Sequence, residues 1–181
     1  MAEREEGRPK RKRIRLKEYD YSQPGAYFVT VCARDRACVF GEIDNDTVLL
    51  TAAGKAVEEA LIALPERFRA LGIDSYAVMP NHVHAILFIT EENTGAASSA
   101  PTLGRIMRAF KSLSAHSVRS SGGCSKSGLW QRSYYEHVVR TEADLNGIRQ
   151  YILDNPLQWE LDEENPQGRA HAPNRIGVRT M

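Results

Sequence analysis

Two histidines standing directly before an unbroken apolar run constrain the fold of this chain more than any other feature. His82 and His84 are followed by Ala85–Ile89, a short stretch of aliphatic and aromatic residues. Runs of this length, rich in β-branched and aromatic residues and bounded by turn residues, are typical of buried strands. The preceding Pro80 and Asn81 predict a turn. The two histidines should therefore mark the start of a buried strand.

Residues two apart on a strand point to the same face, so His82 and His84 are expected to present their imidazoles side by side. Two neutral imidazoles on one rigid strand form half of a divalent-metal site. The alternative is a pair of ordinary polar residues at a strand edge. Because the pair follows a turn, we expect it at an exposed strand mouth, where sites usually occur and where replacement of either histidine costs little stability.

The rest of the chain alternates between strand and helix patterns. Strands are predicted over residues 26–33, 73–79, 82–89 and 136–139, and helices over residues 51–68, 102–118 and 141–153. The order β-α-β-β-α-β, followed by a helix, is the ferredoxin-like split βαβ arrangement. The predicted fold class is therefore α+β, with an antiparallel sheet, two helices on one face and an additional C-terminal helix.

The net charge of +1 conceals two basic blocks. Residues 1–17 hold eight Lys or Arg against three Glu, and residues 105–140 hold seven basic residues against one acidic residue. Two such blocks suggest a polyanion along one face, whereas the alternative is a solvated arm and an ordinary polar helix face. The candidate DNA-binding residues are Arg105, Arg108, Lys111 and Arg132. The first three are spaced by three along one predicted helix, so they should share a face.

The length of 181 residues suits one domain of ordinary size. We expect a single domain over residues 18–160, between a flexible basic arm (residues 1–17) and a polar tail (residues 161–181). No apolar stretch approaches the ~18 residues of a membrane span, and no apolar segment follows the basic N-terminus as in a signal peptide. Three cysteines without a CxxC pair argue against a disulfide framework and a thiolate zinc site. A cytoplasmic protein without a membrane partner is expected.

The last predicted helix carries further residues with chemical potential. Tyr151 and Asn155 are four apart and so share a helix face. A phenol can act as a covalent nucleophile, and an amide oxygen suits a hard metal ion. Taken singly, a helical tyrosine is more often a packing residue, and an asparagine before Pro156 more often ends a helix. His137 taken singly is likewise better explained as a strand-face residue than as a ligand.

Three sequence blocks occur in a specific order and spacing: Tyr76–His84, Leu129–Arg140 and Tyr151–Pro156. Together they resemble the REP-associated tyrosine transposases. These are single-tyrosine HUH transposases, relatives of the enzymes that move small insertion sequences as single-stranded DNA. The resemblance begins near Tyr19 and runs through Pro156, which is most of the chain.

The resemblance implies that His82 and His84 bind the metal, that Tyr151 is the nucleophile and that Asn155 completes the metal site. Many relatives outside this subgroup have Gln at the last position. The resemblance also implies Mg²⁺ or Mn²⁺ as cofactor and single-stranded DNA with a hairpin as partner, cut beside the hairpin through a 5′-phosphotyrosine. A nucleoid-associated location in the cytoplasm follows, and a homodimer is one open alternative for the assembly.

Two other functions are open at this point. One is a domesticated nucleic-acid-binding module that keeps the fold without cleavage, and the other is a phosphodiesterase in which water attacks and Tyr151 is structural. A pure binder does not require His82, His84 and Tyr151 together, so we expect a metal-dependent transposase and endonuclease. The absence of a GxxxxGK[ST] phosphate loop agrees with rejoining that needs no ATP. Trp130 is expected either to stack on a base or to lie in the core.

Overall fold

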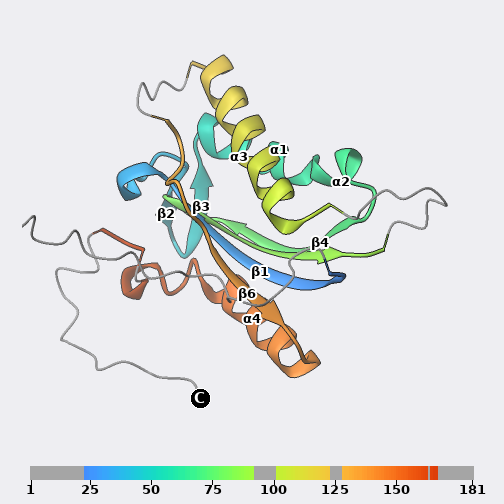
Figure 1. Ribbon diagram of the computed structural model, residues 1–181. Helices are drawn as coiled ribbons and strands as arrows, with labels where there is room; N and C mark the ends of the chain where they lie inside the picture. Colours follow the sequence, from blue (N-terminus) through green and yellow to red (C-terminus); the bar gives the residue numbers. More distant parts are fainter. Residues whose placement is uncertain (1–22, 92–100, 123–127, 163, 167–181) are drawn as a thin grey trace, which may run out of the picture.

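The computed structural model describes residues 23–91, 101–122, 128–162 and 164–166. Its main sheet has the strand order β4-β5-β1-β6, and each neighbouring pair is antiparallel (Figure 1). The strands are β1 (Gly25–Cys32), β4 (Leu71–Val78), β5 (His82–Ile89) and β6 (Tyr135–Val139). The longer helices are α1 (Ala52–Ile62), α3 (Leu103–Ser120) and α4 (Glu142–Asp154). Their order along the chain confirms the predicted α+β, split βαβ arrangement.

Different helices cover the two faces of this sheet. The helices α1, α3 and the short α2 (Leu64–Arg67) lie on one face, and α4 lies on the other (Figure 1). Alternate residues of β5 therefore meet different neighbours: Val83 and Leu87 join the main core, whereas Ile86 joins a smaller cluster with α4. Burial on both faces explains why the apolar run is continuous rather than alternating. The same alternation turns His82 and His84 toward the α4 face.

The predicted helix over residues 51–68 is interrupted. Thr51 caps α1 as predicted, and its Oγ1 accepts a hydrogen bond from a backbone N–H of the first turn at 3.1 Å. However, α1 ends at Ile62 and α2 follows as a separate short helix. Pro65 lies in the first turn of α2. Because proline has no N–H and its ring collides with the carbonyl one turn earlier, one continuous helix cannot pass through it. The prediction of a single helix was wrong in its second half.

A separate two-stranded sheet between β1 and α1 was not predicted. The strands β2 (Gly41–Asp44) and β3 (Thr47–Leu50) pair through a turn at Asn45 and Asp46. Both turn residues have positive φ angles, of 46° and 61°, as the type I′ turn of a two-residue hairpin requires. Glycine adopts this conformation more readily than Asp does. The Asn45-Asp46 dipeptide is therefore a weaker sequence signal for a hairpin turn than Asn-Gly.

The placement of α4 depends on a small apolar cluster and one ion pair. Leu145 and Ile152 pack against apolar residues of β1 and β5. On the β4 side, the Arg149 guanidinium donates two hydrogen bonds to the Asp74 carboxylate, at 2.8 and 2.7 Å. These contacts resist rotation of the helix about its axis. They thereby fix the side of α4 that carries Tyr151.

The predicted basic arm (residues 1–17) and residues 167–181 of the predicted tail lie outside the described residues. Residues 161, 162 and 164–166 of that tail are described, and Asp162 and Glu164 lie against the end of the sheet. No helix in the described part of the chain is both long and apolar enough to cross a membrane.

Candidate active site

The histidine pair lies where the β4–β5 hairpin turns. The Met79 N–H donates to the His82 carbonyl at 2.8 Å and closes the two-residue turn. The two side chains share a face as predicted, with their Nε2 atoms 2.9 Å apart. However, His82 is 0% and His84 is 2% exposed. The expectation of an exposed strand mouth was wrong, because α4 and the chain that follows it cover the pair.

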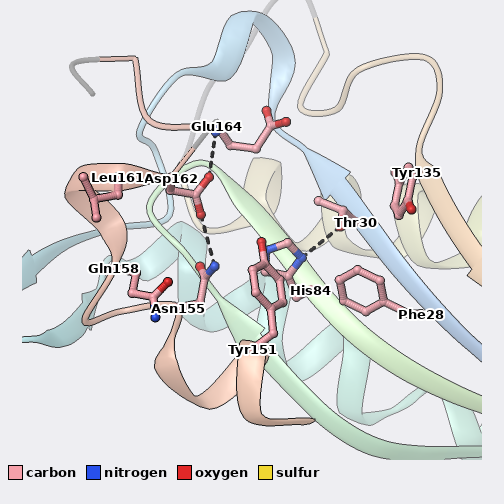
Figure 2. A pocket seen from close by; sticks show the side chains of 10 residues that line it. All are labelled: Phe28, Thr30, His84, Tyr135, Tyr151, Asn155, Gln158, Leu161, Asp162 and Glu164. Carbon is pink, nitrogen blue, oxygen red and sulfur yellow. Dashed lines mark hydrogen bonds between the residues drawn. The ribbon is translucent and has the colours of Figure 1, made fainter. Parts of the chain in front are cut away.

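Tyr151 reaches this pair from α4. Its hydroxyl lies 3.4 Å from Nε2 of His84, and its ring meets Phe28 edge-on with the centroids 6.0 Å apart. The residue is 44% exposed and lines a cavity of about 550 Å³ (Figure 2). The phenol is thus open to solvent on one side and adjacent to the His84 imidazole on the other, as a nucleophile requires.

Asn155 lies one helical turn after Tyr151 and lines the same cavity, as the spacing of four predicts (Figure 2). Its Nδ2 donates to Oδ2 of Asp162 at 3.1 Å. Its Oδ1 is buried and accepts no hydrogen bond of good geometry from the described residues. A buried amide oxygen without a donor is costly. This oxygen is therefore suited to a cation.

Asp162 is a residue of the site that sequence reasoning missed. Its Oδ2 lies 3.9 Å from Nε2 of His82, and its Oδ1 accepts from the Glu164 backbone N–H at 2.6 Å. One ligand atom each from His82, His84 and Asp162 lie within 4.8 Å of one another. The sequence offers only an acidic run over residues 160–164. Such a run is more typical of solvated surface than of a site.

Two uncharged side chains contact the outer nitrogens of the imidazoles. Oδ1 of Asn81 lies 2.9 Å from Nδ1 of His82, and Oγ1 of Thr30 lies 2.9 Å from Nδ1 of His84. The Asn81 amide nitrogen also donates to two backbone carbonyls, at 3.0 and 2.8 Å. With both Nδ1 atoms engaged, the two Nε2 atoms face each other and the carboxylate of Asp162.

Burial keeps both imidazoles neutral. Desolvation lowers the pKa of His82 to about 4, opposed in part by the Asp162 carboxylate and the Asn155 amide. Desolvation also lowers the pKa of His84 well below 6.5, and the neighbouring His82 adds to this. At neutral pH each ring therefore keeps a lone pair, which is the protonation state that metal ligation requires.

These donors fit a hard or borderline divalent cation. Two imidazole nitrogens accompanied by a carboxylate and an amide oxygen form a set that Mg²⁺ or Mn²⁺ accepts. Cys32 is near in the fold and its Sγ lies 3.4 Å from the Glu164 carboxylate. Burial raises the pKa of that thiol to about 12, so it is not available as a thiolate ligand.

The predicted DNA-binding residues do not line this cavity. Helix α3 lies on the sheet face opposite α4 (Figure 1). Arg105 and Arg108 belong to α3 and line a separate hollow of about 270 Å³. Lys111 departs from the expected shared face: its Nζ donates to two backbone carbonyls of the loop over residues 128–134, at 2.9 Å each. Burial lowers the pKa of Lys111 to about 8. Steps of three residues drift by about 60° each around a helix, which explains the divergence. Arg132 is exposed in the same loop.

Two further aromatic residues of the sequence blocks have structural contacts. Trp130 packs against the main core, and its Nε1 donates to Oγ of Ser114 at 3.0 Å. The core alternative for Trp130 is therefore the one the structure supports. Nε2 of His137 lies 2.9 Å from the Asp144 carboxylate at the start of α4. This contact agrees with a strand-face residue rather than a ligand.

Comparison with known proteins identifies the family. Residues 27–155 match the family model described as "Transposase IS200 like". An uncharacterized protein of Haemophilus influenzae is 34% identical over 84% of this chain and 92% of its own length. The REP-associated tyrosine transposase of Escherichia coli is 26% identical over 76% of this chain and 70% of its own length.

A solved structure of a REP-associated tyrosine transposase bound to a REP hairpin has the same fold. It is 22% identical and superimposes with a TM-score of 0.56, covering 80% of this chain and 74% of that chain. The resemblance read from the three sequence blocks is thereby confirmed. This chain belongs to the IS200-like transposase family and is a DNA transposase.

Proposed function

We propose that this transposase cleaves and rejoins single-stranded DNA beside hairpins, with Tyr151 as nucleophile and Mg²⁺ or Mn²⁺ as cofactor. The observation that carries the proposal is that the Tyr151 hydroxyl lies 3.4 Å from Nε2 of the buried His84 and that both residues line one cavity (Figure 2). A hairpin substrate is supported by the relative that was solved bound to a REP hairpin.

In the proposed reaction, the phenolic oxygen of Tyr151 attacks the phosphorus of the scissile linkage. The bond to the 3′ oxygen breaks, so the products are a 5′-phosphotyrosine and a free 3′-hydroxyl. The phenol gives its proton to solvent in the cavity, and the departing oxygen takes one up. A phenol with an ordinary pKa of ~10 is a better leaving group than an alkoxide. A 3′-hydroxyl can therefore attack in reverse and rejoin the strand without ATP.

The proposed metal ligands are His82, His84 and Asn155, to which the geometry adds Asp162. A bound divalent ion would polarise the scissile phosphate and offset charge in the transition state. With a divalent ion bound, two neutral imidazoles and one carboxylate would offset only part of the charge of the ion. The site would therefore keep a net positive charge and still attract a phosphate. The chain's own part is to hold these donors buried and unprotonated at neutral pH.

We assign the DNA backbone contacts to Arg105, Arg108 and Arg132, and add Arg67. Arg67 lines the same hollow as Arg105 and Arg108, and the Arg105 guanidinium lies 5.9 Å above the ring of Phe68. Guanidinium groups beside an apolar floor suit phosphates flanked by sugars and bases. DNA as the partner also implies a cytoplasmic, nucleoid-associated location.

A covalent-adduct assay separates this function from its alternatives. The full chain is incubated with Mn²⁺ and hairpin DNA labelled at its 3′ end, because a 5′-phosphotyrosine retains the downstream strand. Wild type should yield a labelled protein band in a denaturing gel, and Tyr151→Phe should yield none. Tyr135→Phe is the matched control, since Tyr135 lines the same cavity (Figure 2). Cleavage without an adduct would indicate the phosphodiesterase, and binding without cleavage the domesticated module.

A further inference from the structure

The hydrogen bonds of Asn81 determine which nitrogen of His82 carries the proton. Nδ2 of Asn81 contacts the backbone carbonyls of Arg36 at 3.0 Å and of Glu164 at 2.8 Å. Carbonyl oxygens only accept, so the NH₂ group must face them and Oδ1 must face Nδ1 of His82, at 2.9 Å. An amide oxygen in turn needs a donor. Nδ1 of His82 therefore carries the hydrogen, and its Nε2 carries the lone pair.

The tautomer of His84 follows from the contact between the two rings. Nε2 of His84 lies 2.9 Å from Nε2 of His82, the nitrogen to which the lone pair has just been assigned. Two lone pairs at this distance would repel, so in the metal-free protein Nε2 of His84 carries a hydrogen and donates it. Nδ1 of His84 is then an acceptor, and the Thr30 hydroxyl 2.9 Å away donates to it.

Ligation through both Nε2 atoms requires a change at one ring only. His82 already presents a lone pair on Nε2, whereas His84 must lose the Nε2 hydrogen and gain one at Nδ1. The exchange leaves the charge and the number of protons on the ring unchanged. A hydroxyl can both donate and accept, so Thr30 can serve either tautomer by rotating. A side chain that only donates or only accepts would favour one state.

We propose that Asn81 and Thr30 are positioning residues of the metal site: Asn81 holds His82 in the ligating tautomer, and Thr30 accommodates both tautomers of His84. The inference rests on the proposed metal site. Asn81 also ties His82 to the loop after β1 and to the chain after α4, which restrains the orientation of the ring. Hydrogen-bond partners on the ring nitrogen that does not bind the metal set both the tautomer and the ring orientation of metal-binding imidazoles.

Imidazole tautomers can be read directly by long-range ¹H–¹⁵N spectra of the ¹⁵N-labelled full chain. In the metal-free protein, His82 should carry its hydrogen on Nδ1 and His84 on Nε2. Saturation with Mg²⁺ should move the hydrogen of His84 to Nδ1 and leave His82 as it was. A hydrogen on Nε2 of metal-free His82 would overturn the role of Asn81. An unchanged His84 tautomer in the saturated protein would overturn the role of Thr30.

Substitution of Thr30 adds a second readout. Thr30→Val keeps the shape and the β-branch but removes the hydroxyl, so Mn²⁺ affinity measured by electron paramagnetic resonance should fall by about tenfold or more. Thr30→Ser restores the hydroxyl and should bind nearly as wild type does. If the wild type bound no Mn²⁺, the proposed metal site would fall and both positioning roles with it, whereas a wild type that binds Mn²⁺ no better than Thr30→Val would overturn the role of Thr30 alone.

Discussion

Mild acid should destabilise the metal-free protein, because two neutral imidazoles are buried in its site. Burial lowers the pKa values of His82 and His84 below the ordinary ~6.5 of an unfolded chain. Between the unfolded and folded values, the unfolded chain binds more protons than the folded chain. The free energy of unfolding should therefore be highest above about pH 7 and fall as the pH falls toward the folded values.

The size of this effect for His82 follows from its pKa of about 4 in the folded protein and the ordinary pKa of ~6.5 in the unfolded chain. Between about pH 7.5 and 5.5, an unfolded histidine changes from mostly neutral to about nine-tenths protonated, whereas folded His82, with a pKa of about 4, stays neutral. That difference removes roughly 1 kcal/mol from the free energy of unfolding. His84 adds to the loss because its pKa is lowered in the same direction. A loss of more than about 1 kcal/mol is a large share of the stability of a typical domain.

Urea denaturation of the metal-free full chain across this pH range measures the loss. His84→Gln should be less stable than wild type near neutral pH, yet its stability should depend less steeply on pH because one buried imidazole is gone. His116→Gln is the matched control, since His116 is exposed on α3. A wild-type free energy that stays flat over the range, or an equally steep dependence in His84→Gln, would refute the reasoning.

Changes at other positions of the chain are expected to have separate effects on stability, DNA binding and metal binding. Lys111→Met should lower the free energy of unfolding by about 1–3 kcal/mol in urea, because the backbone carbonyls of a neighbouring loop lose a charged donor; an unchanged midpoint would contradict its structural role. Changing Arg105 and Arg108 to Gln should flatten the log–log salt dependence of single-stranded DNA affinity by roughly 0.7 for each phosphate that the variant no longer neutralises. Deletion of residues 1–17 should flatten it further, and a slope unchanged by both would place the DNA path elsewhere. Asp162→Asn should weaken Mn²⁺ binding by about tenfold or more in a paramagnetic resonance titration, and wild-type affinity would remove Asp162 from the ligand set.

Local patterns were sufficient to predict the elements that carry the histidines and the tyrosine. The turn and the apolar run that define β5 are contiguous in the sequence, and β5 begins at His82 as predicted. A spacing of four places Tyr151 and Asn155 on one face of any helix, and both line the cavity. Such relations depend on strand and helix geometry alone, so tertiary packing does not alter them.

Interactions between distant segments were not predictable in this way. The two carbonyls that orient Asn81 belong to residues 45 and 83 positions away in the chain. Asp162 reaches the histidines only because the chain turns back after α4, and no local pattern in an acidic run encodes that turn. Lys111 was expected to be a surface cation because sequence spacing does not show which loop packs beside the helix.

Mass spectrometry of a trapped reaction would test the role of Tyr151 most directly. The full chain would be incubated with hairpin-containing single-stranded DNA and Mn²⁺, denatured, and digested with nuclease and protease. We predict that the peptide containing Tyr151 carries a nucleotide joined through its 5′ phosphate to the phenolic oxygen. Cleaved DNA with no modified tyrosine, or a nucleotide attached to Tyr135 instead, would contradict the assignment of Tyr151 as the nucleophile.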